Sequence, residues 1–463
     1  MQSIEKKNEK LATEPIAKLL LQMSLPTLLA QLVNLLYNIV DRMYVGRIKG
    51  SGSLALAGLG VTFPITILVS AFACLIGMGG ASRMAIALGD KDNEKAEKIL
   101  GNCTTMLLIL GVVLPLIFLP FQEVILKTFG ATEEILPYSS QYITIYLAGT
   151  IFVQISFGLN MFITNQGFAN ISMMTTCIGA ILNIILDPIL IFGFDLGVRG
   201  AAIATIISQA ISAIWVLHFL TSKKATLSIK ASSMRLSWSI LGPVIALGIS
   251  PFVMQATECL IQLTFNKGMV KYGNVSYVAL MSILFSVTQV IWMPLQGFAQ
   301  GAQPIIGYNY GAKDYERVKK TFGLLFKIAM GFSIIIIAVV EIFPGIFLGM
   351  FTDDVALIEL GKPAMRIFLL GMSVMGAQSA CQQTFLALGE AKISMFLALL
   401  RKVILLLPLA LILPKLFGLG VWGLFLAEPI SDFIAATTTT TLFFLRSRKL
   451  FQKDSNVIEM SEK

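Results

Sequence analysis

The sequence predicts an all-α, polytopic membrane protein with about twelve transmembrane helices in two six-helix lobes. The first observation is composition: of 463 residues, 56% are hydrophobic and only 13% are charged, with a mean hydropathy of +0.81. A soluble domain carries about 25% charged residues. The other two observations are a series of long apolar segments and an internal repeat.

Apolar segments of about 20 residues are long enough to cross the hydrocarbon core as helices. The sequence contains about twelve, near residues 19–44, 57–81, 99–121, 138–160, 170–192, 200–221, 240–265, 277–302, 321–344, 364–387, 394–417 and 421–445.

The distribution of basic residues predicts the orientation. Most of the 35 Lys and Arg residues fall in the N-terminal segment, the even-numbered loops and the C-terminus, and Lys327 lies just inside a span. The positive-inside rule then puts both termini in the cytoplasm of a multi-pass protein of the cell membrane. The net charge of +9 is therefore attributed to loops that face anionic lipid, with no nucleic-acid partner expected. The opening "MQSIEKKNEK" has no apolar core, so we expect no signal peptide.

Two pairs of similar segments share one spacing. "GDKDNEKAEK" begins at Gly89 and "GAKDYERVKK" at Gly311, and "GFANISM" from Gly167 matches "GEAKISM" from Gly389; both pairs are 222 residues apart. Each half then holds six spans, which gives a parallel repeat of the kind found in secondary transporters. We therefore expect an N-terminal lobe over 1–221, a basic cytoplasmic linker over 222–237, and a C-terminal lobe over 238–463 with a short basic tail.

Four polar residues inside the spans fall at a similar depth. Asn183 and Asp187 are four residues apart, so they share one face of the fifth span. Asp41 lies 22 residues past Leu19, roughly 33 Å along the first span, and Thr205 lies about two turns into the inward-running sixth span. Two carboxylates, an amide and a hydroxyl at one depth predict a site for H⁺ or Na⁺. The alternative is that the acids are interfacial and that Asn183 and Thr205 pack helices together.

Several motifs make the chain similar to the multidrug and toxic compound extrusion (MATE) family. The resemblance covers essentially the whole chain, and its firmest marks are "ILNIILDPILIFGFDLGVRGAAIAT", the two-lobe repeat and "GFAQGAQPIIGYNYGAKD". It implies a V-shaped pair of six-helix bundles that exports cationic, lipophilic drugs against cation entry. It also implies that Asp41, Asn183, Asp187 and Thr205 bind the coupling cation. The seventh-helix acid of the family is matched by Glu258, whereas Gln378 stands where some branches carry a tenth-helix acid.

Other residues carry weaker predictions. Glu258 is a candidate contact for a drug cation or a hydrogen-bonded acid at the lobe interface. Pro26 and Pro251 occupy corresponding places in the two lobes and are candidate helix-bending positions, either fixed kinks or hinges. The remaining candidates for the substrate-binding surface, where packing or bridging roles are the alternative, are Gln255, Gln378, Met161 and Met254.

Three functional classes follow. The first is an antiporter that exports small, cationic and lipophilic molecules as a monomer, needs no cofactor and is driven by Na⁺ or H⁺. The second is a flippase for lipid-linked precursors or oligosaccharides, from the same superfamily. The third, a membrane-embedded enzyme, is not favoured, because the spans carry no nucleophile–base set and no HExxH motif.

Overall fold

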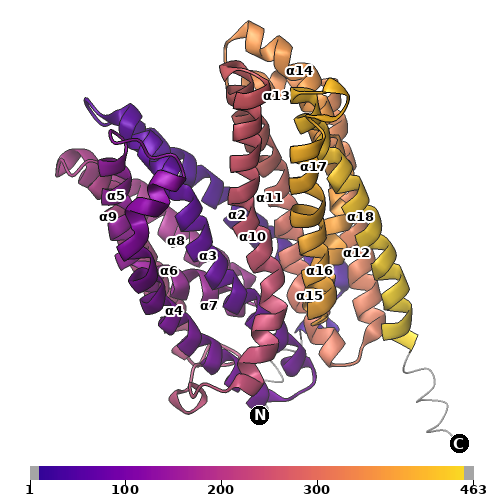
Figure 1. Cartoon of the computed structure of the whole chain (residues 1–463). Helices are drawn as coiled ribbons and strands as arrows, with labels where there is room; N and C mark the ends of the chain where they lie inside the picture. The colour runs from indigo at the N-terminus through magenta and orange to yellow at the C-terminus, as the bar shows by residue number, and fades with distance from the viewer. Residues whose placement is uncertain (1–9, 453–463) are drawn as a thin grey trace, which may run out of the picture.

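The structure is a computed structural model that describes residues 10–452, and within this range every regular element is helical. The helices form two lobes that diverge away from the end of the molecule where both ends of the described chain lie (Figure 1). The prediction of an all-α, two-lobed protein is confirmed.

The N-terminal lobe spans the first half of the chain. Its elements are α2 (Ile16–Gly46), α3 (Gly52–Gly89), α4 (Asn93–Thr128), α5 (Leu136–Ala148), α6 (Thr150–Val153), η1 (Gln154–Gly158), α7 (Leu159–Asn165), α8 (Ala169–Pro188), η2 (Ile189–Gly193) and α9 (Val198–Thr221).

The C-terminal lobe follows the short helix η3 (Ala231–Ser233). Its elements are α10 (Trp238–Tyr272), α11 (Val275–Gly311), α12 (Tyr315–Ile342), α13 (Pro344–Gly349), α14 (Val355–Leu369), η4 (Leu370–Val374), α15 (Met375–Ala387), α16 (Ala391–Leu399), η5 (Leu400–Leu406), α17 (Leu407–Ile412), η6 (Leu416–Gly418) and α18 (Val421–Gln452).

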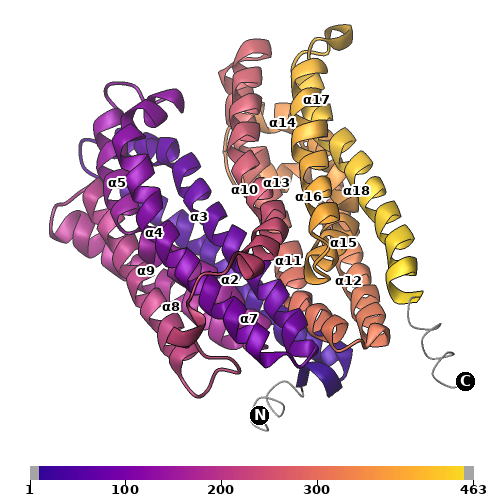
Figure 2. The same cartoon turned by 60° about the horizontal axis from the view of Figure 1, so that its bottom comes forward.

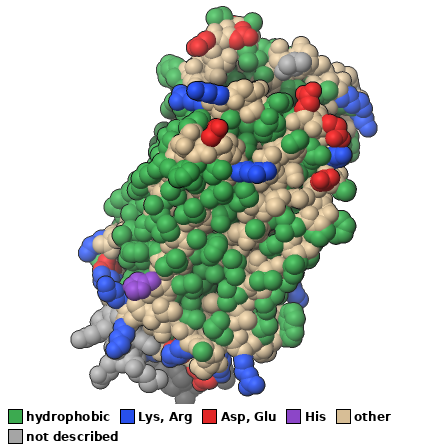
Figure 3. Space-filling model, turned by 90° about the vertical axis from the view of Figure 1, so that its left-hand side faces the viewer, with side chains coloured by type: hydrophobic (Ala, Val, Ile, Leu, Met, Phe, Trp, Pro, Cys, Tyr) green, Lys and Arg blue, Asp and Glu red, His purple; other side chains and the backbone are tan. Residues whose placement is uncertain are grey.

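All twelve expected spans are helical, but they are not equally apolar. Within residues 10–452, nine helices are long and apolar enough to cross a membrane, and the pair 136–148 and 150–165, bent by 60°, makes a tenth. The remaining expected spans are 364–387, which is divided by η4, and 421–445, which lies within α18. Large apolar side chains are exposed on the outer surface, among them Leu116 and Ile214. A broad apolar band lies between charged ends on the side of the molecule seen in Figure 3.

The repeated sequence segments have the same local structure in both lobes. Lys91 and Lys313 both have positive φ values, 60° and 61°. The next residue in each case, Asp92 or Asp314, caps the following helix by accepting a hydrogen bond of 3.0 Å from a backbone N–H three residues later. The matched glycines Gly167 and Gly389 also both have positive φ. This equivalence confirms the two-lobe repeat.

The two lobes contact each other near the end that holds the described chain ends. Helix α10 packs against α3, and α11 packs against both α2 and α3; Figure 2 shows α10 on the side of its lobe that faces α3. Glycines allow the backbones to approach: a Cβ built on Gly248 would lie 2.7 Å from the carbonyl carbon of Leu75. Nearby, Gln303 Nε2 donates a 2.5 Å hydrogen bond to Ser82 Oγ.

The segment 222–237 joins the lobes and lies against the N-terminal lobe. Asn102 on α4 binds it twice, donating to the Ser233 carbonyl at 3.2 Å and accepting from the Ser237 N–H at 2.7 Å. Lys230 forms a 2.7 Å ion pair with Glu97. The segment is therefore held on α4 at several points.

Candidate functional site

A polar cluster lies inside the N-terminal lobe, where α2, α8 and α9 meet. It consists of Asp41, Asn183, Asp187 and Thr205, each of them buried. Asn183 Nδ2 donates to Asp187 Oδ1 at 3.3 Å and to Thr205 Oγ1 at 3.4 Å. The carboxyl groups of Asp41 and Asp187 lie close to each other. The four predicted cation-site residues are therefore brought together in space.

Local structure explains how α8 contributes two members of the cluster. Asn183 and Asp187 are one turn apart on the buried face of α8. Pro188 follows at once and lacks a backbone N–H, and the chain then continues as the π-helical turn η2. Such turns are frequent at functional sites.

Several oxygen atoms in this cluster lack hydrogen-bond partners. They are Asp41 Oδ1, Asn183 Oδ1 and Asp187 Oδ2, all buried. Burying carboxylate oxygens without partners is costly, so they need a proton or a cation nearby. One proton could bridge the two carboxyl groups, and the carboxylate, amide and hydroxyl oxygens together are hard ligands that suit a small cation. The arrangement fits both H⁺ and Na⁺.

Two tyrosines next to the cluster were not predicted. Tyr37 lies one turn before Asp41 on α2 and is close to both carboxylates. Tyr142, on α5, lies close to Thr205 and Asp41. The one-turn spacing of Tyr37 from Asp41 was a usable signal in the sequence, whereas nothing local connected Tyr142 with the site.

A cavity of about 780 Å³ lies between the lobes. Asn183 and Thr205 border it, so the polar cluster is adjacent to the cavity, and Arg42 also lines it. The guanidinium of Arg42 also lies 5.4 Å from the ring centroid of Phe63. This volume falls within the range of about 300–1,000 Å³ found for small-molecule sites.

Most of the predicted substrate-binding residues line this cavity. Met161 belongs to the N-terminal lobe, and Met254, Gln255 and Glu258 follow one face of α10. Gln255 donates a hydrogen bond to the Cys74 sulfur across the lobe interface at 2.8 Å. Gln378 does not line this cavity: it is buried in its lobe and accepts a 3.1 Å hydrogen bond from Thr439.

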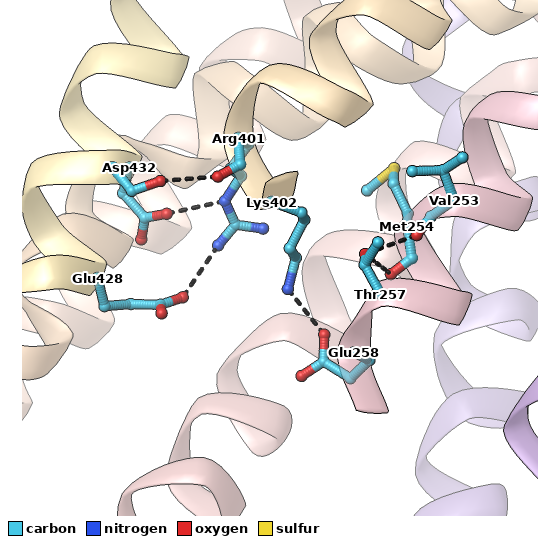
Figure 4. Close-up of polar contacts among 9 residues, drawn as sticks. Val253, Met254, Thr257, Glu258, Arg401, Lys402, Glu428 and Asp432 are labelled. Atoms are coloured by element: carbon cyan, nitrogen blue, oxygen red, sulfur yellow. Dashed lines mark hydrogen bonds and ion pairs between the residues drawn. The ribbon is translucent and has the colours of Figure 1, made fainter. Parts of the chain in front are cut away.

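A second charged cluster lies on the C-terminal side of the cavity and was not predicted. Lys402 Nζ lies 2.7 Å from Glu258, and Arg401 Nε lies 2.8 Å from Asp432 (Figure 4). Arg401 also reaches Glu428 at 3.5 Å. Arg401 and Lys402 lie on η5, inside a candidate span. The expected span 394–417 therefore contains two buried bases, and the lobe neutralises them with acids from α10 and α18.

The two predicted helix-bending prolines lie inside continuous helices, Pro26 in α2 and Pro251 in α10. Beside Pro26, Thr27 Oγ1 donates to the Gly297 carbonyl at 2.7 Å and Ser24 Oγ to the Phe298 carbonyl at 3.3 Å. This part of α2 is thus bound to α11 of the opposite lobe.

The fold and the cavity define a two-lobed, multi-pass membrane transporter, and the comparisons with known proteins give its family. The MatE family model matches residues 26–189 and 251–412, one match in each lobe and more than half of the chain. The chain belongs to the MATE family of efflux transporters.

Curated relatives and solved structures agree with this assignment. The chain is 28% identical over 443 residues to the multidrug export protein MepA of Staphylococcus haemolyticus, covering 95% of this chain and 96% of that protein. MepA of Staphylococcus aureus (strain MRSA252) is 27% identical, with 94% and 95% of the two chains covered. A multidrug resistance MATE transporter of the MOP superfamily, in an outward-facing conformation, superposes with a TM-score of 0.89 at 24% identity, covering 95% of this chain and 98% of that one.

Proposed function

We propose that this protein is an antiporter of the cell membrane that exports cationic, lipophilic compounds against the entry of Na⁺ or H⁺. The observation that carries this proposal is the cluster of Asp41, Asn183, Asp187 and Thr205, whose unpartnered buried oxygens lie next to the interlobe cavity. The MepA relatives, named as multidrug export proteins, support a drug as the exported molecule.

The mechanism that follows is alternating access. The lobes meet at the end where the described chain begins and ends, and the charge pattern assigns this end to the cytoplasm. The cavity then faces outward, as in the outward-facing relative of similar fold. Binding of the cation between Asp41 and Asp187 reduces the negative charge of the two carboxylates and allows α2 to bend or repack at Pro26, which reduces the cavity and expels the compound.

Thermodynamic linkage makes this proposal testable. If the cation and the drug favour different conformations, each must weaken the binding of the other by the same factor. Drug affinity should therefore be measured in detergent with and without Na⁺ and across pH. Drug affinity that is unchanged under every condition would contradict coupling through this cluster. Transport in vesicles under separate Na⁺ and H⁺ gradients then identifies the coupling ion, and we favour Na⁺ because Asn183 and Thr205 add oxygen ligands that a proton does not require.

The second candidate is a flippase for lipid-linked precursors or oligosaccharides. The observation in its favour is that Arg401 and Lys402 both line the cavity, since cationic side chains bind phosphate groups. Against it, both side chains are already paired with carboxylates. Translocation of a lipid-linked pyrophosphate in proteoliposomes, combined with no export of organic cations, would favour the flippase.

A further inference from the structure

The charged cluster of the C-terminal lobe contains one more acid than base. Its five members are Glu258, Arg401, Lys402, Glu428 and Asp432, of which only Asp432 does not line the cavity. With all five ionised, three negative charges face two positive ones. A net charge held inside a membrane protein is expensive and marks a functional position.

The distances show which acid is left over. Lys402 neutralises Glu258, because its Nζ lies 2.7 Å from the carboxylate and interacts with no other acid at that range. Arg401 is bound most closely by Asp432, at 2.8 Å, whose side chain is fully buried. Glu428 lies farther from Arg401, at 3.5 Å. Its Oε2, like Asp432 Oδ2, is buried without a hydrogen-bond partner, but of these two acids only Glu428 lines the cavity.

Glu428 is also placed to meet a ligand. It is 6% exposed and lines the cavity. Figure 4 shows its carboxylate on the far side of Arg401 from Lys402 and Glu258. Trp292 lies on the same side of the cavity, since its ring centroid is 5.5 Å from the guanidinium carbon of Arg401. A carboxylate without a close counter-charge near an aromatic ring suits a lipophilic organic cation, because the apolar groups of the cation are buried while its positive charge is matched.

We propose that Glu428, and not the seventh-helix acid Glu258, binds the positive charge of the transported compound. This assignment rests on the proposed function. It makes Glu428 the cavity residue that selects organic cations with a single positive charge. Binding such a cation at Glu428 makes the cluster neutral. Binding it at Glu258 would displace Lys402 and leave an unpaired buried ammonium, which is strongly unfavourable.

The probe is tetraphenylphosphonium, and its affinity for the full-length protein in detergent is measured by equilibrium dialysis at pH 8. Glu428→Gln should weaken binding about tenfold to a hundredfold, the range expected for loss of a charge-assisted contact. The matched control is the double variant Glu258→Gln/Lys402→Gln, which removes an acid and a base together and keeps the excess charge. This control should bind the probe within a few-fold of the unmodified protein.

The opposite pattern overturns the assignment: loss of binding in the double variant, or unchanged binding in Glu428→Gln. If Glu428→Gln does not fold, as judged by gel filtration, Glu428→Asp and the double variant provide the test. The shorter acid keeps the charge but withdraws the carboxylate, so Glu428→Asp should weaken binding several-fold, whereas unchanged or tighter binding contradicts the assignment. An unmodified protein that neither binds nor exports any organic cation would refute the proposed function itself.

Discussion

Replacing Gly248 with alanine tests whether the contact between α3 and α10 holds the transporter in the conformation described. A Cβ on Gly248 would lie 2.7 Å from the carbonyl carbon of Leu75, 3.0 Å from its Cα, and closer still to its oxygen. All three atoms belong to the backbone of a helix, so no side chain can rotate away. The lobes must therefore separate slightly at this point.

The size of the effect follows from the packing. Inserting a methyl group into a close-packed contact costs about 1–3 kcal/mol. Because this cost falls on the conformation in which α3 and α10 touch, it should shift the equilibrium between conformations by about 5–150-fold. The matched control is Gly242→Ala on the same helix, where a Cβ would have no neighbour within 4 Å. Both variants gain the same helix propensity, so only the steric contact differs.

The assay is a distance measurement between spin labels at Lys95 and Lys320, which are exposed on opposite lobes. The labels are placed in a background without the five native cysteines. Gly248→Ala should populate a longer distance and reduce export, whereas Gly242→Ala should match the unmodified protein. Identical distance distributions in both variants would refute the idea that this contact favours one conformation.

Three further predictions concern the N-terminal lobe and the topology. Asp187→Asn preserves shape but removes a charge, so export should fall sharply while folded protein still reaches the membrane; normal export by a well-expressed variant would make Asp187 structural. Asp41→Asn should abolish ion-driven export and also the antagonism between drug and cation binding, whereas Asp41→Glu should keep part of both. If the drug affinity of Asp41→Asn still responds to Na⁺ or pH as it does in the unmodified protein, Asp41 is an interfacial residue. Accessible tags at both termini and near Lys223 should report the cytoplasm, and an outside signal from the C-terminus would contradict the twelve-span topology.

The sequence by itself determined the features that depend on local spacing. Long apolar runs predict helices because the backbone must satisfy its own hydrogen bonds in lipid. The spacing of Asn183 and Asp187 placed both on one helical face, and the shared turn at Gly89 and Gly311 was visible as a repeat. Depth along each span was enough to group Asp41 and Thr205 with them, because helix rise converts residue number into distance.

Only the tertiary structure decided which helical faces meet. Glu258 and Lys402 are 144 residues apart, and no local pattern indicates that their side chains pair. Gln378 occupies a helix that borders the cavity region, yet its side chain turns toward Thr439 instead. Helical periodicity fixes a side chain's direction relative to its own axis, whereas the rotation of each helix against its neighbours is set by packing across the whole lobe. For this reason the buried bases, and the acid that they leave unneutralised, became visible only in the folded chain.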